Sequence, residues 1–110
     1  MTKVTVEFAT GKDPLQFVDR SFVRVSVRSN EIRSDGTKRW VSQDVPCPNG
    51  ARDLGTEQIK RAVVAAGALL AEYLVEKGLD LIEPVECATA VLVAYEKMLR
   101  LRETRQGEQG

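Results

Sequence analysis

The sequence contains no histidine, and this absence removes several classes of chemistry at once. Histidine is the side chain that titrates near neutral pH, so a serine-type catalytic triad and an ordinary near-neutral general base both lack their usual residue. A zinc site with mixed cysteine and histidine ligands is excluded for the same reason. The composition therefore disfavours a histidine-dependent enzyme.

Cysteine is almost as scarce, since Cys47 and Cys87 are the two in the chain. Their contexts are unrelated, and their spacing matches no metal-ligand or redox motif. We expect two reduced thiols, with Cys47 in an exposed loop between two prolines and Cys87 as a small buried hydrophobe in a helix. No catalytic residue, metal site or cofactor is expected anywhere in the chain.

Long apolar runs are missing too. The longest, residues 62–71, has ten residues, whereas a membrane-spanning helix needs about 20. Residues 1–13 alternate apolar and polar side chains and lack the continuous apolar stretch of a signal peptide. We therefore expect a cytoplasmic protein that does not associate with a membrane.

Neither sign of charge is in excess, because sixteen Lys and Arg balance sixteen Asp and Glu. A dedicated nucleic-acid-binding domain is expected to be basic, which disfavours that class for the chain as a whole. At 110 residues with 43% hydrophobic content, the chain is long enough for a single core. We expect one domain at residues 1–102 and a flexible polar C-terminal tail at residues 103–110.

The first half of the chain has the two-residue period of β-strands. One strand is expected around residues 4–8, a second from residue 21, and a third at residues 38–45. Breaks are expected at residues 11–14 and 46–50, where glycine and proline are frequent. Phe17 and Val18 either form a short strand or extend the second one.

Asp35-Gly36 predicts the turn of a hairpin between the second and third strands. A three-residue loop gives better matched cross-strand partners than a two-residue loop does. The expected pairs are Val27 with Val45, Arg28 with Asp44, and Ile32 with Trp40. Ile32 and Trp40 would then lie with Arg24 and Arg28, on the face opposite the valines.

The second half has the 3.6-residue period of two helices. The first is expected to begin at a cap on Asp53 or Thr56 and to end at Gly78, and the second to begin at Glu83-Pro84. The predicted buried stripes are Ile59, Val63, Ala66, Leu70, Tyr73 and Leu74 in the first helix, and Val85, Ala88, Leu92, Tyr95 and Leu99 in the second. The predicted fold is α+β: a small antiparallel sheet of about three strands, followed by an antiparallel two-helix hairpin packed on one face.

The expected hairpin is locally basic and contains the one tryptophan of the chain. Its candidate partner-binding residues are Arg24, Arg28, Ile32, Arg33, Lys38, Arg39 and Trp40. Tryptophan beside arginine is typical of protein-interface hot spots, and it also suits base stacking in nucleic-acid binding. A third interpretation is an ordinary polar outer face, with Trp40 at the edge of the core.

The helices are more apolar than a layer on a single sheet requires, because their central turns lack a polar face. Small residues spaced four apart permit close approach of another helix, either within the chain or between chains. The candidates for self-association are Gly67, Ala71, Ala90 and Ala94. A homodimer is therefore expected.

The function expected from these features is that of a non-enzymatic protein-interaction or accessory module. It would self-associate through its helices and present the basic β-hairpin to a protein partner. The alternative is a nucleic-acid-binding protein that uses the same arginines with Trp40. The size and the lack of a catalytic motif also suit an accessory or regulatory protein of a virus or mobile element.

Overall fold

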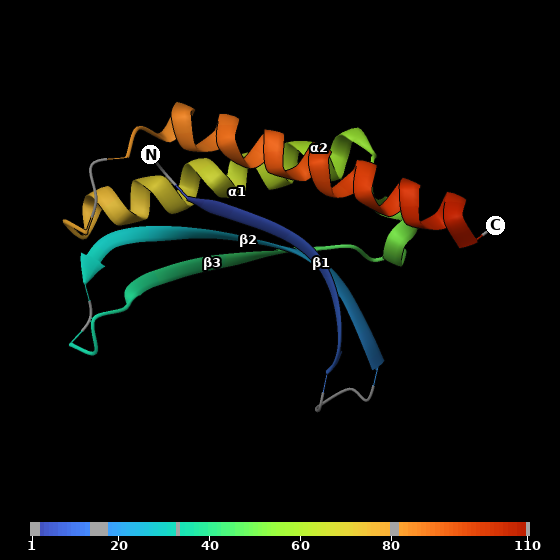
Figure 1. Ribbon diagram of the computed structural model, residues 1–110, viewed down its shortest axis with the longest axis horizontal. Helices are drawn as coiled ribbons and strands as arrows, with labels where there is room; N and C mark the ends of the chain where they lie inside the picture. The colour runs from blue at the N-terminus through green and yellow to red at the C-terminus, as the bar shows by residue number, and fades with distance from the viewer. Residues whose placement is uncertain (1–2, 14–17, 33, 80–81, 110) are drawn as a thin grey trace.

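The computed structural model describes residues 3–13, 18–32, 34–79 and 82–109. The elements in chain order are β1 (Val4–Asp13), β2 (Val18–Ile32), β3 (Lys38–Pro46), η1 (a 3-10 helix, Gly50–Asp53), α1 (Glu57–Glu76) and α2 (Pro84–Gln109). The sheet is antiparallel in the order β1-β2-β3, and both α-helices lie on one face of it (Figure 1). The α+β fold expected from the sequence is confirmed.

In residues 4–8 of β1 and 23–27 of β2, every second residue faces the helices, since successive side chains of a strand point to opposite faces. These residues are Val4, Val6 and Phe8 on β1, and Val23, Val25 and Val27 on β2. The three β2 valines are fully buried, and the β1 residues are half-buried against the same core. Burial of each valine stabilises the fold by roughly 1.5–3 kcal/mol.

The β2–β3 hairpin is paired differently from the expectation. The predicted pairs Val27–Val45, Arg28–Asp44 and Ile32–Trp40 are wrong, and the observed pairs are Val27–Val41, Arg28–Trp40 and Ile32–Lys38. The register shifts between Arg28 and Ile32, an irregularity in β2 that loop length alone does not reveal. On the covered face the observed register forms two valine pairs, Val23–Val45 and Val27–Val41, whereas the expected register forms one, Val27–Val45.

β1 continues to Asp13, past the break expected at residues 11–14, the last of which lies outside the described part of the chain. Phe22 is opposite the last residue of β3. Beyond it, β1 and β2 form a two-stranded ribbon that bends away from the helices (Figure 1). Val18 extends β2 at this end, and Phe17 lies outside the described residues.

Thr56 and Gly78, which flank α1, are two of the residues that the sequence indicates for its ends. Thr56 is the N-cap, and its hydroxyl accepts the N–H of Ile59 at 3.3 Å. Asp53, the other candidate cap, instead accepts the N–H of Asn49 at 2.9 Å and holds the turn before the helix. Gly78 has a φ of 71°, the left-handed conformation that ends helices.

The buried side of α1 is the predicted one with a single exception. Its buried residues include Ile59, Val63, Ala66, Leu70 and Leu74. Tyr73 was expected in this stripe but is 39% exposed, so that prediction is wrong. Tyr73 precedes the buried Leu74, and the helix rotation between neighbouring residues turns its ring to solvent.

The buried side of α2 is rotated relative to the prediction. Tyr95 is buried as predicted, together with Cys87 and Val91, whereas Ala88, Leu92 and Leu99 are half-buried. Val85 was expected inside but is 69% exposed. Residues 88–95 are apolar apart from Thr89, so no polar side marks the face of this helix that meets solvent.

α1 and α2 approach closely at Gly67. A Cβ atom at that position would lie only 2.7 Å from Cγ2 of Val91. Glycine therefore permits the two helices to pack against each other as well as on the sheet.

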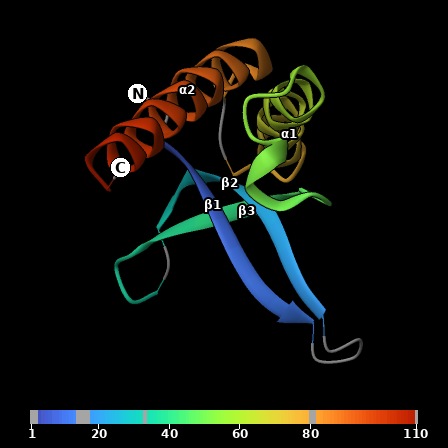
Figure 2. The same ribbon diagram turned by 90° about the vertical axis from the view of Figure 1, so that its right-hand side faces the viewer.

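The two helices cover different strands. α1 packs on β2 and β3, and α2 packs mainly on β1 (Figure 2). The backbone of α2 is helical through Gln109, which includes most of the tail expected at residues 103–110. The flexibility of that tail stays a prediction.

Candidate functional site

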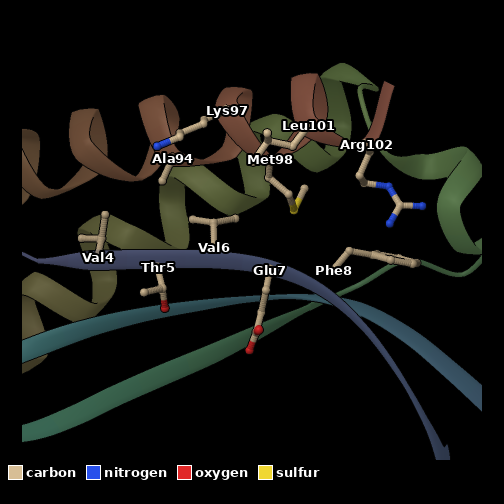
Figure 3. A pocket seen from close by; sticks show the side chains of 10 residues that line it. All are labelled: Val4, Thr5, Val6, Glu7, Phe8, Ala94, Lys97, Met98, Leu101 and Arg102. Carbon is tan, nitrogen blue, oxygen red and sulfur yellow. The ribbon is translucent and has the colours of Figure 1, made fainter. Parts of the chain in front are cut away.

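The face of the sheet opposite the helices, here called the outer face, carries Arg24, Arg28 and Trp40, three of the predicted partner-binding residues. Across β1, β2 and β3 its rows are Ala9–Phe22–Pro46, Glu7–Arg24–Asp44, Thr5–Ser26–Ser42 and Lys3–Arg28–Trp40. Thr5 and Glu7 visibly point away from the helix layer (Figure 3). The outer face is thus polar at its centre, with aromatic rings in its two end rows.

Arg24 is held within the outer face. Its guanidinium donates two hydrogen bonds to Asp44, at 2.9 and 3.2 Å, and lies 5.2 Å from the centre of the Phe22 ring. The hydrogen bond to Asp44 raises the pKa of Arg24 above its ordinary value, and the charges of Asp44 and Glu7 make smaller contributions in the same direction. Arg24 therefore has two carboxylates beside it and is not an uncompensated positive charge.

Trp40 lies opposite Arg28 at the other end of the outer face. Its side chain is 40% exposed, although tryptophan is a residue that proteins usually cover. The prediction that Trp40 shares a face with Arg24 and Arg28 is confirmed, although its partner across the strands is Arg28 and not Ile32. An exposed indole beside a guanidinium can bury a large area against a partner and donate several hydrogen bonds to it.

The remaining predicted hairpin residues do not form a single patch with Trp40. Lys38 is exposed on the same side of β3 as Trp40, whereas Arg39 points to the opposite side by strand alternation. Ile32 is paired through its backbone with Lys38, and Arg33 lies outside the described residues.

The turn that leads into β3 is held by Asp35. Its carboxylate accepts the N–H of Thr37 at 2.9 Å and the hydroxyl of Thr37 at 2.6 Å, and these bonds lower the pKa of Asp35. Gly36 has a φ of 85°, which requires glycine at this position. Both features fix the start of β3 and hence the position of Trp40.

Neither cysteine forms a disulfide, and both are buried. Cys47 was expected in an exposed loop but is 2% exposed, because its N–H bonds to Ser21 and continues the β2–β3 ladder. Burial raises the pKa of the Cys47 thiol, with a further contribution from the charge of Asp53. Cys87 is fully buried, as the sequence predicts. The environment of Cys47 therefore disfavours the thiolate that a nucleophile requires.

Among the residues that the structure describes, no three side chains of Cys, Asp or Glu come together in a group that could hold a metal ion.

The four small residues proposed for self-association have different positions. Gly67 and Ala71 are buried inside the chain, the former against Val91 of α2. Ala90 and Ala94 are half-buried. The most exposed apolar residues of the helices are instead Leu69, Tyr73, Val75, Val85, Val93 and Leu101.

Sequence reasoning missed a groove between β1 and α2. Its volume is about 470 Å³, and it is lined by five consecutive residues of β1, Val4–Phe8, and by one side of α2 (Figure 3). Ala94, Met98 and Leu101 recur at helical spacing on that side of α2. That spacing was the available signal, but it is hidden in a helix that is apolar on several sides.

The chain matches no protein-family model, no curated protein and no solved structure. Among the helices of the described residues, none has the length and apolar character needed to cross a membrane.

Proposed function

We propose that this protein is a non-enzymatic interaction module that presents the outer face of its sheet to a protein partner. The observation that supports this function best is the exposure of Trp40 beside Arg28. Tryptophan and arginine are the residue types most enriched among the contacts that dominate protein–protein affinity. The partner would cover the indole ring and accept hydrogen bonds from the guanidinium.

The charge of the outer face favours a protein over a nucleic acid. A phosphate backbone is bound by several cations together, but Arg24 is paired with Asp44 and lies opposite Glu7. We expect no binding to duplex DNA, single-stranded DNA or RNA in titrations at low salt. Saturable binding with log K falling by about 0.9 for each phosphate contact per tenfold rise in salt would support the nucleic-acid alternative.

The protein interaction is tested by capture from the native host with matched variants. We expect Trp40→Ala and Arg28→Ala to lose a partner that the unchanged protein retains. Arg24→Ala is the control, because Arg24 belongs to the same face but is already bound by Asp44. Unchanged capture by Trp40→Ala would contradict the proposed contact.

Self-association through the helices is part of the same proposal. Leu69 and Val93 are 52% and 59% exposed, so they are better candidates for a contact between copies than the buried Gly67. We expect light scattering to detect a dimer that the double variant Leu69→Lys/Val93→Lys dissociates. A monomer at high micromolar concentration would contradict it.

We place this module in the cytoplasm as an accessory or regulatory protein. Two cysteines that form no disulfide suit a reducing compartment. Thiol counting on protein denatured without reductant is expected to give two thiols per chain, and a count of zero would contradict this location.

A further inference from the structure

The helix layer is wider than the sheet beneath it. A helix with its side chains is about 10 Å across and strands lie about 4.8 Å apart, so one helix covers about two strands. α1 packs on β2 and β3, whereas α2 packs mainly on the single strand β1, which is the edge of the described sheet. The space beneath the outer half of α2 is therefore about one strand wide.

The groove between β1 and α2 lies in this space (Figure 3). β1 contributes Val4, Val6 and Phe8 to it, and α2 contributes Ala94, Met98 and Leu101. These side chains are all apolar, and the Met98 side chain extends toward β1 between Val6 and Phe8 (Figure 3). A strand placed here would have an apolar surface on its helix-facing side.

The backbone of β1 directs hydrogen-bonding groups toward the same space. The N–H of Arg28 donates to the carbonyl of Lys3 at 3.0 Å, which makes these two residues a hydrogen-bonded pair of the ladder. Such pairs recur at every second residue, so the odd-numbered residues of β1 bond to β2. The N–H and C=O groups of Val4, Val6 and Phe8 then point to the open edge, where no described residue is hydrogen-bonded to them.

The two edges of the sheet differ in their protection. On β3, the same alternation directs the backbone nitrogen of Pro46 away from β2, toward the open edge of the sheet. Proline has no N–H, so another strand cannot accept a hydrogen bond there. The segment Val4–Phe8 of β1 has neither proline nor a bulge. Proteins usually shield such an edge, and an open edge beside an apolar groove is typical of strand addition.

We propose that an extended segment of a partner protein adds to β1 as a fourth strand beneath α2. The segment would alternate apolar and polar residues and carry acidic residues at its ends. Lys97 and Arg102 line the α2 side of the groove, where the Arg102 guanidinium lies 4.9 Å from the centre of the Phe8 ring, and among the described residues neither has a carboxylate within ion-pair distance. This surface is separate from the outer face and does not depend on the function proposed above.

A second copy of the chain is a poorer occupant than a separate extended segment. If two β1 strands paired about a twofold axis, the strand in each groove would be the partner's β1. The α2 of each copy covers its own β1 and the groove beside it, so both helices would need the same space.

The test uses fluorescein-labelled peptides of about nine residues, the length of a strand. They carry valine at alternate positions, threonine between, and either glutamate or lysine at both ends. We expect saturable binding of the glutamate peptide by the full-length protein, and binding of the lysine peptide that is weaker by about tenfold or more.

Two substitutions on α2 separate the groove from the rest of the helix. Leu101 and Val93 are exposed to similar extents, 54% and 59%, but only Leu101 lines the groove. Leu101→Glu is expected to weaken binding of the glutamate peptide about tenfold or more, and Val93→Glu to leave it unchanged. Neither substitution removes a buried side chain, so both variants are expected to fold.

Hydrogen exchange provides the readout specific to strand addition. Bound peptide is expected to protect the amides of Val4, Val6 and Phe8, whereas those of Thr5 and Glu7, already bonded to β2, should change little. The proposal would be overturned if neither peptide bound saturably, if the two α2 variants had equal effects on binding, or if bound peptide protected all the amides of β1 equally. A protein dimer that the glutamate peptide dissociates would also overturn it, because the occupant would then be a second copy.

Discussion

At the scale of single residues, Gly67 sets the distance between the helices. A Cβ there would lie 2.7 Å from Cγ2 and 3.1 Å from Cβ of Val91, closer than side chains tolerate. Alanine gains about 1 kcal/mol in helix propensity, but overpacking of a tight contact costs about 1–3 kcal/mol. We expect Gly67→Ala to lower the free energy of unfolding by up to about 2 kcal/mol in urea denaturation.

The control for this prediction is the same substitution in a Val91→Ala background. Removal of the two methyl groups opens the contact, so Gly67→Ala should then be neutral or stabilising. An equal cost in both backgrounds would show that the helices do not meet at this pair.

Tyr95 connects the core to the loop before α1. It is 1% exposed, and its hydroxyl accepts the N–H of Gly55 at 3.0 Å. Tyr95→Phe keeps the ring but leaves that amide without its acceptor, so we expect a loss of about 1 kcal/mol in thermal or urea unfolding. Tyr73→Phe, at a ring that is 39% exposed, serves as the control and should change stability little.

The dependence of stability on alkaline pH comes from two buried groups that can lose a proton, the Cys47 thiol and the Tyr95 hydroxyl. Burial raises the pKa of Cys47 above its ordinary value of 9.0 and that of Tyr95 above 10.0. The folded state therefore favours both neutral forms, and the stability they contribute is complete below about pH 9 and is lost as the pH rises. We expect Cys47→Ala to reduce the decline in unfolding free energy that begins near pH 9. Parallel pH profiles for the two proteins would contradict this.

At the scale of elements, the alternation of buried and exposed residues along each strand could be read from the sequence, but the pairing register between strands could not. The strands and helices follow from patterns within one segment, such as the valines of β2 and the threonine cap of α1. Register depends on two segments at once, and the irregularity between Arg28 and Ile32 has no local sequence signal. The buried side of α2 was misjudged because residues 88–95 are apolar apart from Thr89, so the sequence does not mark which side of the helix meets solvent.

The observed register can be tested by cross-linking. Ser26 and Ser42 are opposite each other, with their hydroxyl oxygens 2.8 Å apart. They form a non-hydrogen-bonded pair, whose Cα atoms are typically about 4.5 Å apart, so Ser26→Cys/Ser42→Cys is expected to form a disulfide under mild oxidation. The register expected from the loop alone would place Ser26 opposite Pro46. Faster cross-linking of Ser26→Cys/Pro46→Cys would therefore contradict the structure.

At the scale of the whole molecule, part of the candidate site was predictable. The sequence correctly placed Trp40 on the face of Arg24 and Arg28. Its observed partner, Arg28, and its expected partner, Ile32, are an even number of residues apart, so both registers leave the Trp40 side chain on the same face. The neutralisation of Arg24 by Asp44 was not predicted, because it depends on the true register. The groove beside β1 was not predicted either, since it arises from the relative widths of a helix layer and a sheet.

The most direct test of the proposed function is photo-crosslinking in the native host from benzoylphenylalanine placed at position 38, which lies on the same side of β3 as Trp40 and leaves the indole in place. We expect a discrete crosslinked protein that disappears when Arg28→Ala is combined with the probe. The control probe replaces Arg61, whose side chain is 83% exposed on α1, away from the outer face. A crosslinked partner at position 38 that is absent from position 61 is the result we predict. The same partners from both positions, or none from position 38, would contradict a protein interface centred on Trp40 and Arg28.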